Sequence, residues 1–123
     1  MSEWQIRFHD AFEAEFIRFE AEIQDALLTV ARLLADYGPR LGRPHADTLN
    51  GSRYPNMKEL RFRAGQAVWR VAFAFDPARQ AILLVAGDKA GTSETRFYKQ
   101  LIATADSRYS QHLSAFQPPE RKT

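Results

Sequence analysis

The 123-residue sequence contains no cysteine. Disulfide bonds and thiolate metal sites are therefore excluded. The three histidines, His9, His45 and His112, do not have the spacing of zinc ligands, so no metal centre is expected. The sequence also lacks a Gly-rich phosphate loop, a nucleophile elbow and any cofactor fingerprint. Together these absences disfavour metal, nucleotide and cofactor chemistry.

Long apolar runs and signal-like segments are also missing. The opening MSEWQIRFHD is neither basic nor continuously apolar, and no apolar run approaches the roughly 20 residues that span a membrane. We therefore expect a cytoplasmic protein with no membrane partner. The length fits one domain with its own core, which we expect to comprise residues 1–116. Residues 117–123, with two consecutive prolines, are expected to form a disordered tail.

Charge is unevenly distributed along the chain, although the formal net charge is only +2. Residues 1–37 contain three Lys/Arg and eight Asp/Glu, whereas residues 38–99 contain eleven Lys/Arg and five Asp/Glu, a difference of +6. The acidic first third is typical of a solvated helical surface. The basic middle segment suggests a polyanionic partner, and the alternative is a basic surface without a defined site.

Met57–Lys89 is the most informative stretch, because it reads as three strands joined by two tight turns. Gly65-Gln66 fits a type II′ turn, and Asp76-Pro77 fits the start of a type I turn. Two consecutive hairpins form a three-stranded meander. If Gly65 and Gln66 are the two loop residues, pairing outward from the turn places Arg61 directly opposite Arg70.

This register sorts the side chains of the first hairpin onto two faces. The apolar face, which we expect to be core, carries Leu60, Phe62, Trp69, Val71 and Phe73. The opposite face carries Glu59, Arg61, Arg63, Arg70 and Ala72. Two arginines directly opposite each other normally destabilise a sheet, which suggests that an anion binds there. The alternative is that Glu59 neutralises the pair, but one carboxylate does not balance three arginines.

The segments on either side of the meander predict an α+β fold. Trp4–Phe8 alternates like a short edge strand, and Asp10 is the expected N-cap of a helical pattern that continues to Tyr37. No Gly or Pro marks a break near Glu20–Glu22, so periodicity favours one helix over two. A final amphipathic helix, capped by Thr92 or Ser93, is expected to pack on the sheet.

Residues 38–56 lack sustained periodicity and are rich in Gly and Pro, so we expect a long loop. Long loops in compact domains are often functional, and this one carries Arg40, Arg43 and Arg53 towards the meander. The alternative is a plain connector. Three apolar residues are expected to pin the loop to the core: Leu41, Leu49 and Tyr54.

The cationic side chains suit RNA cleavage without a metal, in which the ribose 2′-oxygen attacks the adjacent phosphorus. Arginines could donate bidentate hydrogen bonds to the phosphate and stabilise the negative charge that develops on it. Tyr98 or a lysine could move protons, and Glu59 is the only carboxylate on the proposed face that could act as a base. The candidate catalytic residues are Arg61, Arg70, Lys89, Tyr98 and Lys58. The candidate RNA-binding residues are Arg63, Arg53, Arg43 and Lys99.

The sequence resembles the RelE/ParE superfamily of type II toxins, and most closely its phage-derived HigB-like branch. The matching pieces are LLADYGPRLGRPHADTLNGSRYPNMKELRFR, AVWRVAFAF, AILLVAGDKAG and a helix opening with ETRFY. The resemblance implies a small antiparallel sheet, made of an N-terminal strand plus the three-stranded meander. It also implies an N-terminal helical pair and a C-terminal helix around that sheet. It therefore favours two helices where periodicity favours one.

Members of the RelE and HigB branches are ribosome-dependent mRNA endonucleases, neutralised by a cognate antitoxin. The resemblance implies the ribosome, mRNA and a helix-turn-helix antitoxin as partners, with no cofactor. The family's basic site residues fall on Arg61, Arg70 and Lys89, with Tyr98 as a weaker match. The chain departs from the RelE pattern by offering only Lys58 ahead of the first arginine.

Two other functions remain open at this point, because a fold does not determine an activity. One alternative is a ParE-like toxin that binds and inhibits DNA gyrase without cleaving anything. The clustered basic face favours the nuclease, since a gyrase inhibitor has no catalytic need of it. The other alternative is a phage-derived chain without activity.

Overall fold

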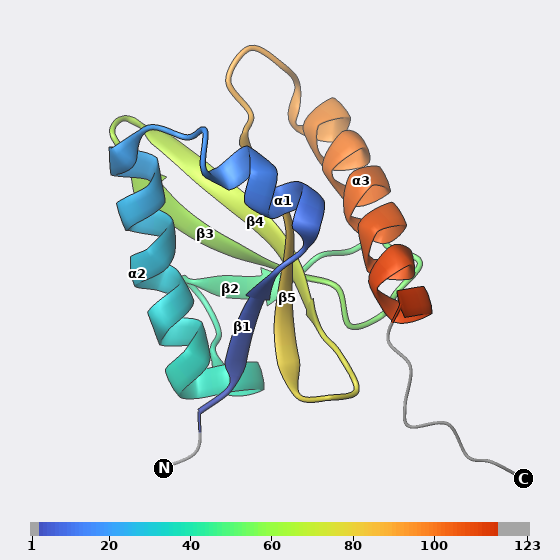
Figure 1. The fold of residues 1–123 in the computed structure, drawn as a ribbon. Coiled ribbons are helices and arrows are strands. Elements are labelled where there is room, and N and C mark those ends of the chain that lie inside the picture. The colour runs from blue at the N-terminus through green and yellow to red at the C-terminus, as the bar shows by residue number, and fades with distance from the viewer. Residues whose placement is uncertain (1–2, 116–123) are drawn as a thin grey trace, which may run out of the picture.

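The computed structural model describes residues 3–115, which form a five-stranded sheet with helices on both faces (Figure 1). In chain order the elements are β1 (Gln5–Phe8), α1 (Asp10–Phe16), α2 (Ala21–Tyr37), the 3₁₀ turn η1 (Gly38–Arg40), β2 (Ala46–Thr48), β3 (Lys58–Ala64), β4 (Ala67–Phe75), β5 (Gln80–Asp88) and α3 (Glu94–Ala115). The strand order is β1-β5-β4-β3-β2. The predicted α+β class is confirmed.

The meander has the predicted register. β3 and β4 are antiparallel, with Arg61 opposite Arg70 and Ala64 opposite Ala67. Gly65 has φ +62°, as the first central position of a type II′ turn requires. At the next turn the backbone N–H of Arg79 donates to the carbonyl of Asp76 over 3.1 Å, which closes the predicted four-residue turn.

Two features of the sheet differ from the prediction. β1 runs parallel to β5, so the sheet is mixed rather than wholly antiparallel. The stretch predicted as a long loop contains the turn η1 and the strand β2, which pairs antiparallel with β3. β2 has three residues, too few for an alternating pattern to stand out. Two of the predicted anchors of this stretch, Leu41 and Leu49, are buried, and Tyr54 packs against the core.

The first helical stretch is two helices, so the single helix favoured by periodicity is wrong and the pair implied by the resemblance is correct. α1 ends at Phe16, whose carbonyl accepts a hydrogen bond of 2.9 Å from the side-chain amide of Gln24 in α2. The chain turns because α1 packs over β5 whereas α2 packs over β3. The N-cap of α1 is His9 rather than Asp10, because His9 Nδ1 accepts the N–H of Ala11 at 3.0 Å. For α3, Ser93 is the cap residue, since its Oγ accepts the N–H of Arg96 at 3.1 Å.

The sheet is buried on both faces. The predicted apolar face packs under α1 and α2, and Leu60, Val71 and Phe73 are fully buried there. On the other face, Ala72 and Ala74 are covered by α3. Among residues 3–115, no helix is both long and apolar enough to cross a membrane. The predicted disordered tail lies outside the described residues.

Candidate functional site

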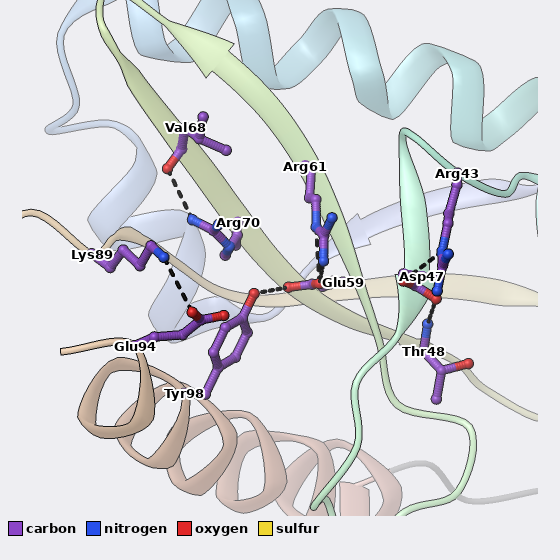
Figure 2. A network of polar contacts seen from close by, with 10 residues as sticks. All are labelled: Arg43, Asp47, Thr48, Glu59, Arg61, Val68, Arg70, Lys89, Glu94 and Tyr98. Carbon is purple, nitrogen blue, oxygen red and sulfur yellow. Dashed lines mark hydrogen bonds and ion pairs between the residues drawn. The ribbon is translucent and has the colours of Figure 1, made fainter.

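The predicted basic pair lies on the α3 face of the sheet, beside the first turns of α3 (Figure 2). Arg61 of β3 is opposite Arg70 of β4, and Arg70 is opposite Gly87 of β5. The ring of Tyr98 in α3 has its centroid 5.7 Å from Cζ of Arg70. Two strands and one helix therefore bring Arg61, Arg70 and Tyr98 together.

Two carboxylates offset two of the arginines. Nε and Nη2 of Arg61 donate to Oε2 of Glu59 over 3.0 and 2.7 Å. Asp47 of β2 lies directly opposite Glu59, and Nε of Arg43 donates to its Oδ2 over 3.0 Å. The backbone N–H of Thr48, and then the Arg43 side chain, hold the pKa of Asp47 below its usual value. The site therefore carries less net positive charge than the sequence predicted.

Arg70 differs from Arg61 because it has no carboxylate partner within residues 3–115. Its Nη1 donates to the carbonyl of Val68 over 3.3 Å, and its Nε is buried without a hydrogen-bond partner. Its Cζ lies 5.8 Å from the ring centroid of Phe97 and 5.7 Å from that of Tyr98. Aromatic faces attract a guanidinium but do not neutralise it. Arg70 therefore keeps its positive charge available for an anion.

Tyr98 is a hydrogen-bond donor in this site. Its hydroxyl donates to Oε1 of Glu59 over 2.8 Å. Burial, and then the hydrogen bond to the negatively charged Glu59, raise the pKa of Tyr98 above its usual value. The phenol is therefore protonated at neutral pH, which suits a proton donor and not a base.

Lys89 follows the last residue of β5 and lies on the Arg70 side of the site. The side chains of Lys89 and Arg70 line a shallow pocket of about 460 Å³. Nζ of Lys89 lies 3.5 Å from Oε1 of Glu94, and 38% of the Lys89 side chain and 65% of the Glu94 side chain are exposed. An exposed ion pair of this length contributes little, so Lys89 can exchange this partner for an anionic ligand.

The structure does not bring Lys58 to the same side as Arg61. Lys58 lies opposite Phe73 of β4, and alternation along β3 directs its side chain to the face of Leu60 and Phe73 under α2. Arg63 is on the Arg61 face, two residues nearer the turn, and is exposed.

Two other predicted RNA-binding residues are on or near α3 but outside this cluster. The backbone N–H of Arg53 donates to Asp106 over 3.0 Å, and the Arg53 side chain lies over the ring of Tyr54. This places Arg53 beside the second half of α3, whereas Tyr98 is in its first half. Lys99 is exposed on α3 immediately after Tyr98.

Sequence reasoning missed Asp47 and Phe97. Asp47 lies in the stretch predicted as a loop, and Phe97 lies in the predicted C-terminal helix. Phe97 is indeed buried, but it also lies over Arg70. One signal was available: Gly87 interrupts β5, and a glycine inside a strand often marks close approach of another group. A Cβ at Gly87 would lie 3.3 Å from a ring carbon of Phe97.

Comparison with known proteins gives one family and two relatives. A family model described as "Phage derived protein Gp49-like (DUF891)" matches residues 14–110. The chain is 43% identical over 104 residues to "Putative toxin HigB2" of Mycobacterium tuberculosis (strain ATCC 25618 / H37Rv), covering 84% of this chain and 51% of that protein. It is 49% identical over 100 residues to "Putative toxin HigB3" of the same strain, covering 79% of this chain and 85% of that protein. The match thus spans about half of the first relative and most of the second.

Proposed function

Because the chain belongs to the phage-derived Gp49-like family, we propose that it is the toxin of a toxin–antitoxin pair and that it cleaves mRNA at the ribosome. Membership of this family confirms the resemblance to the phage-derived HigB-like branch. The names of the two relatives support the toxin assignment. The nuclease activity and the ribosome come from the resemblance to RelE and HigB toxins, and the geometry of the site supports the nuclease activity.

The observation that carries the nuclease proposal is the pairing of Arg61 with Arg70 beneath Tyr98. A phosphate bound over β3 and β4 would accept hydrogen bonds from the N–H groups of Arg61 and Arg70. Preorganised donors of this kind stabilise the charge that develops on phosphorus-bound oxygens in the transition state. Arg70 contributes the charge that no carboxylate of residues 3–115 offsets.

The reaction proposed for this site is an internal displacement at phosphorus. The ribose 2′-oxygen gives its proton to a base and bonds to the adjacent phosphorus, while the bond from phosphorus to the 5′-oxygen breaks. The 5′-oxygen takes up a proton, which leaves a 2′,3′-cyclic phosphate and a 5′-hydroxyl. We propose Tyr98 as the proton donor: its hydroxyl proton, held by Glu59 in the resting site, passes to the 5′-oxygen when that oxygen replaces Glu59 as the acceptor. Lys89 adds positive charge at the Arg70 end of the site.

We also propose a cognate antitoxin as the physiological partner. A toxin that cleaves mRNA must be held inactive until it is needed, and binding of a second protein over the site would do this. The resemblance implies an antitoxin of the helix-turn-helix type, and mRNA on the ribosome implies action in the cytoplasm.

The proposal is tested by inducing the chain in a bacterial host and mapping new mRNA 5′ ends. Supercoiling by DNA gyrase is assayed in parallel on the purified protein. Cleavage sites that appear within minutes of induction, and that depend on Arg70, would support the proposal. Inhibition of gyrase without new mRNA ends would replace it with the ParE-like alternative.

A further inference from the structure

Glu59 is one of two charged residues that are buried in the described part of the chain, with 3% of its surface exposed. A buried carboxylate costs several kcal/mol unless hydrogen bonds and opposite charge compensate it. Glu59 is therefore expected to have specific partners that compensate its burial. Its hydrogen bonds therefore indicate what it does.

Both oxygens of this carboxylate have partners. Oε2 accepts Nε and Nη2 of Arg61, at 3.0 and 2.7 Å. Oε1 accepts the hydroxyl of Tyr98 at 2.8 Å (Figure 2). To remove a proton from RNA, Glu59 would have to release one of these donors and reach out of a buried position. This arrangement does not fit a general base.

The same contacts fix the two groups that face the proposed phosphate position. Arg61 is held by Nε and one terminal nitrogen, so its other terminal nitrogen is not engaged by Glu59, and 41% of the Arg61 side chain is exposed. Tyr98 is held by its hydroxyl, which keeps its ring over Arg70. One carboxylate therefore links β3 to α3 and sets the orientation of both side chains.

We propose that Glu59 is a positioning residue of this site, which holds Arg61 with one oxygen and Tyr98 with the other so that both act on a single phosphate. This inference rests on the proposed function of the same site. It replaces the role of base that sequence reasoning offered for Glu59. Asp25 provides the comparison, since it is an exposed carboxylate of α2 on the other face of the sheet.

The first test needs no catalytic activity. Glu59→Gln removes the charge with little change in shape, and Asp25→Asn does the same at an exposed position of α2. Tyrosine ¹³C NMR follows the titration of Tyr98, and ¹⁵N NMR follows the Nε–H signal of Arg61. In Glu59→Gln we expect the pKa of Tyr98 to fall relative to wild type and the Arg61 signal to shift and exchange faster with water. In Asp25→Asn both signals should stay close to wild type.

The second test measures mRNA cleavage on ribosomes as a function of pH. A misplaced donor typically costs about 100-fold in rate, so Glu59→Gln should lower kcat by about this factor with a smaller change in KM. The acidic limb of the pH profile should persist, because another group provides the base. The cleavage rate of Asp25→Asn should stay within about threefold of the wild-type rate, as expected for a surface substitution outside the site.

Several outcomes would overturn the inference. An unchanged Tyr98 titration and Arg61 signal in folded Glu59→Gln would show that Glu59 does not position them. Loss of the acidic limb would identify Glu59 as the base. If Glu59→Gln does not fold, Glu59→Asp replaces it in the test. Asp keeps the charge but is one methylene too short to hold both partners. An unchanged Tyr98 titration in Glu59→Asp would then show that Glu59 does not position Tyr98. If wild type cleaves no RNA, the proposed function fails, while the NMR result still decides the role of Glu59.

Discussion

Arg61 and Arg70 face each other across β3 and β4, yet of these two arginines only Arg61 has a carboxylate partner among residues 3–115. Like charges placed directly opposite each other destabilise a sheet, and Glu59 offsets the charge of Arg61 but not that of Arg70. Arg70 is instead held against two aromatic rings and a backbone carbonyl. This asymmetry makes Arg70 the residue whose removal should separate activity from stability.

Arg70→Ala should lower mRNA cleavage by about 100- to 1000-fold, the usual cost of removing a preorganised donor. Its unfolding free energy should change by less than about 1 kcal/mol, since lost aromatic contacts are offset by relief of repulsion with Arg61. Arg70→Lys should recover activity only in part, because it keeps the charge and loses the planar fork. Cleavage and thermal melting are measured together, with Arg32→Ala on the exposed face of α2 as the control. A folded Arg70→Ala that cleaves at the wild-type rate would contradict the assignment.

Lys58 and Lys89 should behave differently when each is changed to Ala. Lys89 lines the pocket beside Arg70, so Lys89→Ala should reduce cleavage by about tenfold or more, the loss of one charged contact of about 1.5 kcal/mol. The Lys58 side chain points to the opposite face of the sheet. The cleavage rate of Lys58→Ala should therefore stay within about threefold of the wild-type rate. Rates are compared at the same salt concentration. Equal losses in both variants would mean that the Lys58 side chain reaches the site around the sheet edge.

Enlarging Gly87 should disturb the site through Phe97. A Cβ there lies 3.3 Å from the Phe97 ring, so Gly87→Val should destabilise the fold by about 1–3 kcal/mol through overpacking. Displacing Phe97 should also move the neighbouring Tyr98 and lower cleavage. Gly42→Ala is the control, because no atom lies within 4 Å of its added Cβ. The reading of Gly87 as a close-approach position fails if Gly87→Val melts like wild type.

Asp76 predicts how stability depends on pH. It is buried at the turn between β4 and β5, where it accepts hydrogen bonds from the backbone N–H groups of Ala78 and Gln80 and is bonded to His112 of α3. Burial acts to raise the pKa of Asp76, but the hydrogen bonds from His112 and Gln80 outweigh it, so the pKa is lower than usual. A depressed pKa in the folded state means that the carboxylate stabilises the fold above its unfolded pKa of about 3.9. This stabilisation is lost as the pH falls through the folded-state pKa.

Asp76→Asn should therefore destabilise the protein by about 1–3 kcal/mol at pH 7, and the difference from wild type should shrink in acid. Urea unfolding between neutral and acidic pH measures both quantities. Asp25→Asn, on the exposed side of α2, controls for the loss of one negative charge. If Asp76→Asn and wild type lose stability in parallel on acidification, the acid sensitivity of the fold comes from other groups.

The meander and its register could be predicted because their causes are local. Gly65 allows a positive φ at one turn, and each residue outward from that turn then has a determined partner and face. The same reasoning identified Arg61 and Arg70 as neighbours, and helical periodicity after a cap at Thr92 or Ser93 identified α3. Family resemblance supplied the break between α1 and α2, for which the sequence has no local signal.

The sequence by itself therefore determined the hairpins, the basic pair and the apolar stripes, since these follow from spacing and turn chemistry within short segments. Only the tertiary structure decided how the site is charged and held. β2 is too short to reveal its alternation, yet its pairing with β3 places Asp47 opposite Glu59. The hydrogen bond from the Tyr98 hydroxyl to Glu59 joins residues 39 positions apart, and it forms because α3 packs across the sheet. Contacts of this range depend on how whole elements bury their apolar faces, and no local pattern contains that information.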